Sequence, residues 1–299
     1  MDRPLHNFAS LLNAAARQLA AVSDAPRLEA EVLLAAALGR PRAYLHAWSE
    51  RAPEPEQAAR FADWLERRLR GEPVAYLLGR REFWSLDLEV TPDTLIPRPD
   101  TELLVELALA RLPAEHPVAV ADLGTGSGAI ALALAVERPR ARIVATDRSP
   151  LALTVARRNA RRLMINNVEF REGDWCEPLA GARFELIVSN PPYVATTDPG
   201  WRRGAWRYEP SAALAAGTDG LEALRAIVRQ APDHLQPDGW LLLEHGYDQG
   251  ETTPALLRER GFTDVRDHLD IAGLSRASSG RWPGCKDTLQ GLRLPVDLL

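Results

Sequence analysis

The first 72 residues place apolar side chains at helical spacing. Apolar residues recur three and four positions apart in segments 8–19, 28–38 and 61–69, which puts them on one face of each segment. Pro53 and a second proline two residues later interrupt the pattern, because proline lacks the amide hydrogen that a helix interior uses. The pattern therefore predicts a small helical bundle over residues 1–72.

The pattern changes to alternation after residue 72. In residues 86–90, every second residue is apolar and the residues between are acidic, which predicts a half-buried strand. We expect residues 75–78 to pair with this strand. Residues 73–95 would then form a hairpin that joins two domains.

The third part of the chain, residues 96–299, alternates strands and helices. Two prolines stiffen its first residues, and Asp100 or Thr101 is expected to cap a helix that runs to about Leu112. The expected strands cover residues 118–121, 142–145, 168–171, 184–189 and 240–243, and the expected helices cover 130–136, 151–163 and 220–235. This alternation predicts an α/β fold with a doubly wound, mostly parallel, Rossmann-like sheet covered by helices on both faces.

Composition narrows the class of protein. A length of 299 residues suits about two domains, and a net charge of −5 disfavours a general nucleic-acid binder, which is normally basic. Cys176 and Cys285 form no CxxC pair and the six histidines are scattered, so we expect neither a disulfide framework nor a metal site. No run approaches the roughly 18 apolar residues of a membrane span. We expect a protein of the reducing cytoplasm with no membrane partner.

A glycine-rich turn follows the first strand of the α/β part and opens a helix. The run reads Asp122, Leu123, Gly124, Thr125, Gly126, Ser127 and Gly128. Glycines allow a tight turn and a close approach of backbone N–H groups to a ligand, and a helix N-terminus favours a carboxylate or phosphate. The spacing GxGxG differs from the GxGxxG of dinucleotide-binding proteins, and a purely structural tight turn is the simpler alternative.

Two further acidic positions follow the next strands. Asp147 ends the second strand, where a carboxylate can accept hydrogen bonds from both hydroxyls of a ribose; a helix cap is its structural alternative. Asp174 and Trp175 follow the third strand. A carboxylate there can accept from an adenine amino group, and an indole can pack on the ring, although a surface turn with a half-buried tryptophan explains the pair equally well.

The motif Asn190-Pro191-Pro192-Tyr193 follows the strand at 184–189. Proline disfavours helix in the preceding residue and offers no N–H donor, so the Asn190 side-chain oxygen and the Pro191 carbonyl are two acceptors close together. Such a pair can hold an NH2 group through both of its hydrogens, and Tyr193 can lie against the same planar group. A proline-rich turn is the alternative, but ligands bind at the carboxyl ends of strands in doubly wound sheets.

Together these features resemble the class I S-adenosylmethionine-dependent methyltransferases that modify planar amino groups. The helical N-terminal region and the segments 73–84 and 96–102 are similar to the release factor glutamine methyltransferase (PrmC/HemK) family. So are Tyr208-Glu209-Pro210, residues 188–194 and residues 241–246. Two positions depart from that family: Ser85 stands where we expect glycine, and residues 275–280 are polar where the family usually closes with an apolar strand. A tail of about 18 residues follows.

The resemblance implies methyl transfer from S-adenosylmethionine to the side-chain N5 of the glutamine in the Gly-Gly-Gln motif of class 1 peptide-chain release factors. Asn190, Pro191, Pro192 and Tyr193 would be catalytic. Asp122 and the turn Gly124–Gly128 would hold the methionine part, Asp147 the ribose, and Asp174 and Trp175 the adenine, with Asn190 also bordering the cofactor. The N-terminal bundle would dock the partner, or else serve as a structural cap, and we expect a monomer.

Three alternatives remain at this level. An adenine-N6 nucleic-acid methyltransferase uses the same four-residue motif, and Arg202, Arg203 and Arg207 could serve it, although the net charge disfavours it. A glutamine methyltransferase acting on a ribosomal protein is closer. A non-catalytic NAD-binding or scaffold protein has no use for the motif at 190–193.

Overall fold

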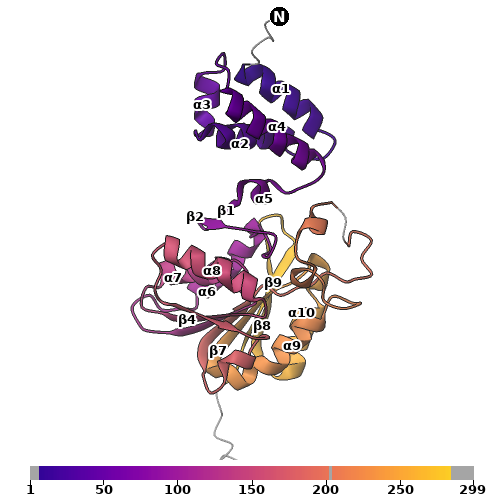
Figure 1. Cartoon of the computed structure of the whole chain (residues 1–299). Coiled ribbons are helices and arrows are strands. Elements are labelled where there is room, and N and C mark those ends of the chain that lie inside the picture. Colours follow the sequence, from indigo (N-terminus) through magenta and orange to yellow (C-terminus); the bar gives the residue numbers. More distant parts are fainter. Residues whose placement is uncertain (1–6, 202–203, 284–299) are drawn as a thin grey trace, which may run out of the picture.

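The computed structural model describes residues 7–201 and 204–283, and it places a helical bundle above an α/β unit (Figure 1). The bundle consists of α1 (Phe8–Leu19), α2 (Pro26–Leu38), α3 (Arg42–Ala47), α4 (Pro55–Leu69) and the short α5 (Val74–Leu78). Its core is apolar and includes Leu12, Leu33 and Leu45, which are almost fully buried. An ion pair of 2.8 Å joins Arg68 of α4 to Glu29 of α2. The predicted helical bundle is confirmed.

The predicted hairpin has a different first strand. Residues 75–78 are helical within α5, and the strands are β1 (Arg80–Phe83) and β2 (Leu86–Glu89). A short apolar run does not distinguish helix from strand. The side chains of α5 pack against both parts of the molecule. Leu77 packs into the bundle, and Tyr76 packs with Val90 of the α/β unit.

The hairpin is built into the α/β unit. Phe83 and Leu88 are almost fully buried in the main core, and the Asn159 side chain pairs with the Glu89 backbone through bonds of 2.7 and 3.0 Å. The turn between the strands needs positive φ at both residues, and Ser85 has φ +57. Glycine adopts that conformation most readily, which is the physical reason to expect glycine at this position.

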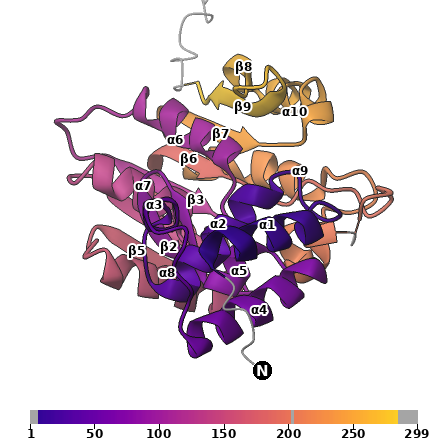
Figure 2. The same cartoon turned by 90° about the horizontal axis from the view of Figure 1, so that it is seen from above.

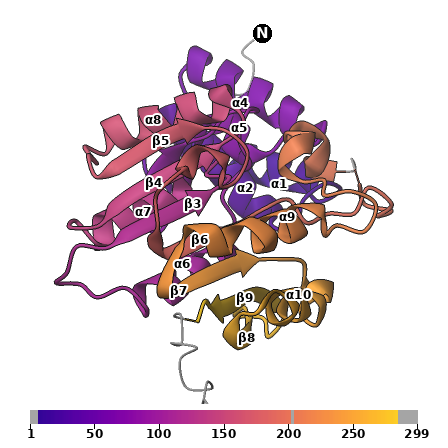
Figure 3. The same cartoon turned by 90° about the horizontal axis from the view of Figure 1, so that it is seen from below.

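The α/β unit contains a seven-stranded sheet in the order β5-β4-β3-β6-β7-β9-β8. The strands are β3 (Ala119–Leu123), β4 (Arg142–Asp147), β5 (Val168–Glu172), β6 (Phe184–Ser189), β7 (Leu235–Glu244), β8 (Thr263–Leu269) and β9 (Ser275–Arg281). The first five strands in this order are parallel, and β9 is antiparallel to both of its neighbours. Figure 3 shows the sheet from below with β5 towards one edge and β8 and β9 at the other.

Helices cover both faces of the sheet. They are α6 (Glu102–Leu109), α7 (Ala129–Glu137), α8 (Pro150–Arg162), α9 (Glu222–Gln230) and α10 (Thr252–Arg260), with short 3-10 turns η1 (Pro99–Thr101), η2 (Glu177–Leu179), η3 (Gly204–Tyr208), η4 (Ser211–Ala213), η5 (Ala231–His234) and η6 (Tyr247–Gln249). One apolar core includes α6 and α7, and a second includes α9 and α10. Seen from above, the bundle lies nearest the viewer (Figure 2). The predicted doubly wound α/β architecture is confirmed.

The polar segment 275–280 forms an interior strand. Ser278 and Ser279 of β9 are fully buried between β7 and β8. Their hydroxyls lie 2.8 Å from His245 Nε2 and 2.9 Å from His268 Nε2. Buried hydroxyls are tolerated when they are hydrogen-bonded, so this strand forms without an apolar sequence. The end of the expected tail, from residue 284, lies outside the described residues.

Candidate active site

Two adjoining cavities lie beside the carboxyl ends of the central strands. In the strand order, β4 lies next to β3 on one side and β6 lies next to β3 on the other. The order of the strands therefore reverses direction at β3, and ligands bind at such switch points in doubly wound sheets. The first cavity has a volume of about 370 Å³, which suits a small organic ligand. The second has a volume of about 210 Å³, and Leu95 and Ala213 line both.

The glycine-rich turn forms one wall of the first cavity. Gly124 and Gly126 line it and have φ of +70 and +57, a conformation that glycine adopts without strain. A Cβ atom on Gly124 would lie 3.3 Å from the Trp175 ring. At Gly124, the absence of a side chain therefore leaves the space beside the Trp175 ring open.

The other predicted residues of the turn lie beneath it. Asp122 is almost fully buried, and its Oδ2 accepts from the Thr125 hydroxyl at 2.6 Å and from the Ala131 amide at 3.1 Å. Burial raises the pKa of Asp122 to about 7. Ser127 is also buried. The residues that line the first cavity do not include Asp122, Thr125, Ser127 or Gly128. Asp122 and Thr125 therefore support the turn, and the expected contact of Asp122, Thr125, Ser127 and Gly128 with the cofactor stays a prediction.

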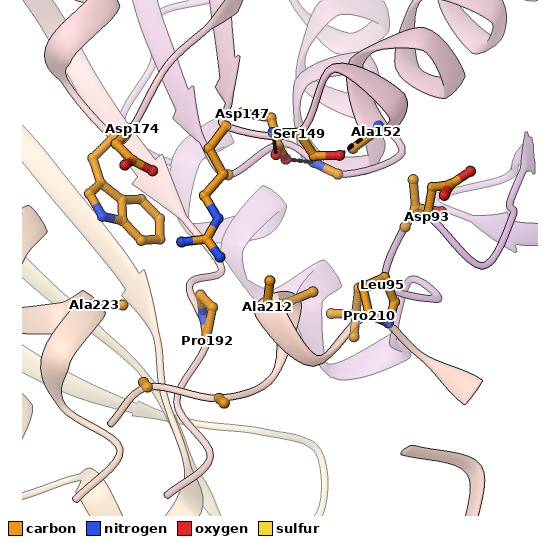
Figure 4. Close-up of a pocket in the computed structure, with 18 of the residues that line it drawn as sticks. Asp93, Leu95, Asp147, Ser149, Ala152, Asp174, Pro192, Pro210, Ala212 and Ala223 are labelled. Atoms are coloured by element: carbon orange, nitrogen blue, oxygen red, sulfur yellow. Dashed lines mark hydrogen bonds between the residues drawn. The ribbon is translucent and has the colours of Figure 1, made fainter. Parts of the chain in front are cut away.

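Asp147 lines the first cavity at the end of β4 (Figure 4). One carboxylate oxygen accepts from the Gly126 amide at 2.9 Å and the other from the Ser149 amide at 2.9 Å. The cap of α8 is Ser149, whose hydroxyl accepts from the Ala152 amide, so the helix-cap alternative for Asp147 is wrong. Burial raises the pKa of Asp147. Each carboxylate oxygen has a second lone pair with which to accept from a ligand.

Asp174 and Trp175 complete this side of the cavity. Both line it, and Asp174 is exposed. Figure 4 shows Asp147 and Asp174 on one side of the cavity, across from Pro192 and Ala212. The wall therefore combines two carboxylates, a flat indole and an open glycine backbone, a set that suits a ligand with hydroxyls and a planar ring.

The motif at 190–193 separates the two cavities. Pro192 lines the first cavity, whereas Asn190, Pro191 and Tyr193 line the second. Asn190 therefore lies on the second cavity, and its expected contact with the cofactor stays a prediction. The hydroxyl of Ser189 donates to the Leu123 carbonyl at 2.7 Å, which ties the end of β6 to the end of β3. This hydrogen bond holds the residue that precedes the motif against β3.

Two polar residues that the sequence did not single out as site residues hold the motif. Asn190 Nδ2 donates to Thr101 Oγ1 at 3.0 Å, and the Tyr193 hydroxyl donates to Glu244 Oε1 at 3.3 Å. Of the two expected caps, Asp100 and Thr101, Thr101 occupies the N-cap position of α6, but its side chain makes no capping hydrogen bond there. Thr101 and Glu244 lie in stretches that carry the family resemblance, 96–102 and 241–246, and that was the available signal.

Glu209 holds the loop that lines both cavities. Its buried carboxylate accepts from the Ile96 amide at 3.1 Å and pairs with the Arg98 guanidinium. Tyr76 of α5 donates from its hydroxyl to the Thr94 carbonyl at 2.6 Å, and burial raises the pKa of this hydroxyl. Three stretches far apart in the sequence therefore meet beside the second cavity.

A contact links this region to the helical bundle. The Tyr208 hydroxyl donates to the Arg70 carbonyl at the end of α4 at 2.9 Å, and the Arg207 guanidinium donates to the same carbonyl. Arg207 also lies 4.8 Å from the centre of the Tyr208 ring. Trp206, the preceding residue, lines the second cavity, so the bundle contacts the segment that shapes this cavity.

Within residues 7–201 and 204–283, no group of three or more His, Cys, Asp or Glu side chains is arranged to hold a metal ion. In the same part of the chain, no helix has the length and apolar character needed to cross a membrane.

Comparisons with known proteins agree with this architecture. The model of the PrmC N-terminal domain matches residues 10–79, and the model of the methyltransferase small domain matches residues 100–201. A solved structure of a methyltransferase from Pyrococcus furiosus has a TM-score of 0.52 at 20% identity and covers 75% of this chain and 99% of that one. That similarity supports the fold.

Similar sequences extend over most of the chain. A release factor glutamine methyltransferase from Pseudomonas aeruginosa is 55% identical over 260 residues, which cover 87% of this chain and 94% of that protein. A release factor glutamine methyltransferase from Coxiella burnetii is 48% identical over 265 residues, which cover 89% and 95% of the two chains.

Proposed function

Since this chain belongs to the release factor glutamine methyltransferase family, we propose that it methylates N5 of the glutamine in the Gly-Gly-Gln motif of class 1 peptide-chain release factors, with S-adenosylmethionine as donor. The enzyme is a glutamine methyltransferase of the class I fold. The observation that carries the residue assignments is the position of the motif at 190–193 between two adjoining cavities. The first cavity would hold the donor and the second the glutamine side chain.

The residues of the first cavity fit S-adenosylmethionine. The Asp147 carboxylate would accept from the ribose hydroxyls, and Asp174 and Trp175 would border the adenine. Gly124 and Gly126 would leave room for the methionine part, since a side chain at Gly124 would reach the Trp175 ring. When bound, S-adenosylmethionine supplies a methyl group on a positively charged sulfonium.

The second cavity supplies the groups that activate the acceptor. The amide nitrogen of glutamine is a poor nucleophile, because its lone pair is delocalised into the carbonyl. Asn190 Oδ1 and the Pro191 carbonyl would accept the two N–H bonds of the amide, hold it towards Pro192 and the first cavity, and stabilise positive charge that develops on the nitrogen. This combines positioning with electrostatic stabilisation. Methyl transfer would leave S-adenosylhomocysteine in the first cavity. The amide would then lose one proton to water, because none of these groups is a strong base.

The bundle would dock the release factor. The contact of Tyr208 and Arg207 with the Arg70 carbonyl supports this docking role. The neighbouring residue Trp206 lines the second cavity. A protein held by the bundle would thus lie close to the acceptor site. Arg207 takes part in this contact between the bundle and the second cavity. Arg202 and Arg203 lie outside the described residues.

The proposed substrate is tested by offering labelled S-adenosylmethionine with a purified class 1 release factor, ribosomal proteins or DNA in separate reactions. We expect label on the release factor alone, and mass spectrometry should place one methyl group on the glutamine of the Gly-Gly-Gln peptide. Label on DNA, or on a ribosomal protein with an unlabelled release factor, would contradict the proposal.

Asp147→Ala should weaken binding of S-adenosylmethionine by about 10- to 100-fold, since hydrogen bonds to a charged group contribute about 1.5–3 kcal/mol. Isothermal titration calorimetry measures the affinity. Because Asp147 also binds the Gly126 and Ser149 amides, Asp147→Asn provides a second variant with the same shape and no charge. Asp24→Ala, on an exposed residue of the bundle, is the matched control. Unchanged affinity in both Asp147 variants would refute the assignment to the ribose.

A further inference from the structure

Gln249 of η6 is a buried residue that lines neither of the two cavities. Its Oε1 accepts from the Gly246 amide at 2.9 Å. Its Nε2 donates to the Tyr193 carbonyl at 3.2 Å and to the Gly220 carbonyl at 3.2 Å. This one side chain therefore joins three segments, namely the residues that follow β7, the motif at 190–193 and the loop before α9.

The three partners fix the orientation of the Gln249 amide. The two ends of a glutamine amide have nearly the same shape, so its hydrogen-bond partners decide which end faces which way. Here one partner is an N–H group and the other two are carbonyls, so a single orientation satisfies all three. The N–H partner is anchored to the sheet, because the amide of the preceding residue, His245, donates to the Arg276 carbonyl of β9 at 2.9 Å. Gln249 thus connects the motif to the sheet.

The peptide unit at the end of the motif depends on this connection. The two prolines of the motif contribute no N–H group. The next peptide unit, between Tyr193 and Val194, is bonded on both sides: its carbonyl accepts from Gln249, and its N–H donates to the Leu214 carbonyl at 2.9 Å. Because a peptide unit is planar, these two bonds together fix its rotation. Without Gln249, only the bond from the N–H remains, and the carbonyl loses its partner.

We propose that Gln249 is a positioning residue for methyl transfer, which sets the direction of the Tyr193 ring in the second cavity. Tyr193 lines that cavity, and its hydroxyl donates to Glu244 at 3.3 Å. The bond from Gln249 holds the backbone of the same residue, so Tyr193 is fixed at both ends. Asn190 is held separately, by Thr101, so Gln249 acts through Tyr193. This inference deepens the proposed function and rests on it, since the ring is taken to lie against the amide of the substrate glutamine.

The first cavity depends less on Gln249 than the second does. Gly220, the other carbonyl partner, lies in the loop before α9, and the first residue of that helix, Glu222, lines the first cavity. The start of α9 has a further hydrogen bond, from the Glu222 amide to the Ala216 carbonyl at 3.3 Å. That bond does not involve Gln249. Replacement of Gln249 should therefore affect methyl transfer more than binding of S-adenosylmethionine.

Gln249→Met, in the full-length enzyme with the release factor as substrate, should lower kcat by about 10- to 100-fold, the scale of a displacement of about 1 Å near the reacting groups. Methionine has a similar length but cannot donate to the two carbonyls. Calorimetric affinity for S-adenosylmethionine should stay within about threefold of that of the wild type. Gln249→Asn, shorter by one carbon and unable to span the three partners, should also lower kcat. Gln236→Met, the same substitution at a half-buried position at the opposite end of β7, is the matched control and should retain wild-type turnover.

A double variant separates positioning from a general structural role. Tyr193→Ala removes the ring and should itself lower kcat. In that background, Gln249→Met should add no more than about a twofold loss, because Gln249 acts through Tyr193. A residue that only stabilised the fold would add its loss in full, and would lower the thermal transition and the donor affinity together with turnover. Should Gln249→Met fail to fold, as judged by its thermal transition, Gln249→Asn alone and in the Tyr193→Ala background decides.

Several outcomes would overturn the inference while leaving the proposed function intact. They are wild-type turnover in the Gln249 variants or in Tyr193→Ala, fully additive losses in the double variant, a loss of donor affinity as large as the loss of turnover, and failure of both Gln249 variants to fold. A wild-type enzyme that does not methylate the release factor would instead overturn the proposed function, and this inference with it.

Discussion

Asn190→Ala should lower kcat for methylation of the release factor by about 10²- to 10³-fold, the scale on which one preorganised hydrogen-bonding group contributes to catalysis. Asn190 lines the second cavity, and its Oδ1 is one of the two proposed acceptors for the substrate amide. Without it, the amide loses its orientation and the stabilisation of developing positive charge. The first cavity is lined by other residues, so affinity for S-adenosylmethionine should remain within about twofold of wild type.

Single-turnover kinetics with labelled donor measure the loss, and calorimetry measures the retained affinity. Asn166→Ala, at an exposed position, is the matched control and should behave as wild type. Turnover in Asn190→Ala equal to that of the control would remove Asn190 from the mechanism. A loss of donor affinity as large as the loss of turnover would instead place Asn190 on the cofactor.

Gly220→Ala should destabilise the fold by roughly 2–5 kcal/mol and also impair turnover. Gly220 has φ +74, and a Cβ there would lie 2.5 Å from the Tyr193 carbonyl oxygen and 2.9 Å from Gln249 Nε2. Left-handed backbone costs an L-residue about 1–2 kcal/mol, and forcing an extra carbon into a packed site costs about 1–3 kcal/mol more. The Tyr193 carbonyl belongs to the motif that lines the second cavity, and Gln249 Nε2 donates to that carbonyl.

Gly39→Ala is the matched control for this substitution. Gly39 has φ +64 at the end of α2, with no atom within 4 Å of the added Cβ, so only the backbone cost applies there. Chemical denaturation measures both free energies of unfolding, and the difference between the variants isolates the contact with the motif. Equal destabilisation in the two variants would show that Gly220 does not support Tyr193.

The sequence predicts those parts of the site that are contiguous along the chain. The glycines at 124 and 126 and the motif at 190–193 follow strands, and Asp147 ends one. Parallel strands bring their carboxyl ends to one edge of the sheet. Local pattern and the rules of the fold are therefore enough to gather them at one place. The same reasoning did not identify residues that reach this edge from elsewhere.

Thr101 and Glu244 illustrate the limit. Thr101 precedes a helix and favours a capping role by position alone, but its hydroxyl binds Asn190, 89 residues away. Glu244 ends an apolar strand, and only the packing of β7 beside β6 brings it to Tyr193. No local signal distinguishes such residues from ordinary caps and strand ends, because their partners are set by the sheet order.

By itself, the sequence determined the helical bundle, the alternating strands and helices, and the motifs at the ends of the strands. These depend on periodicity and on the backbone preferences of glycine and proline, which act locally. Only the tertiary structure decided that residues 75–78 are helical, that Asp122 lies beneath its turn, and that the polar strand β9 is buried. In each case the outcome depends on which groups from distant parts of the chain pack against the residue or form hydrogen bonds with it. Tertiary packing decides which groups those are.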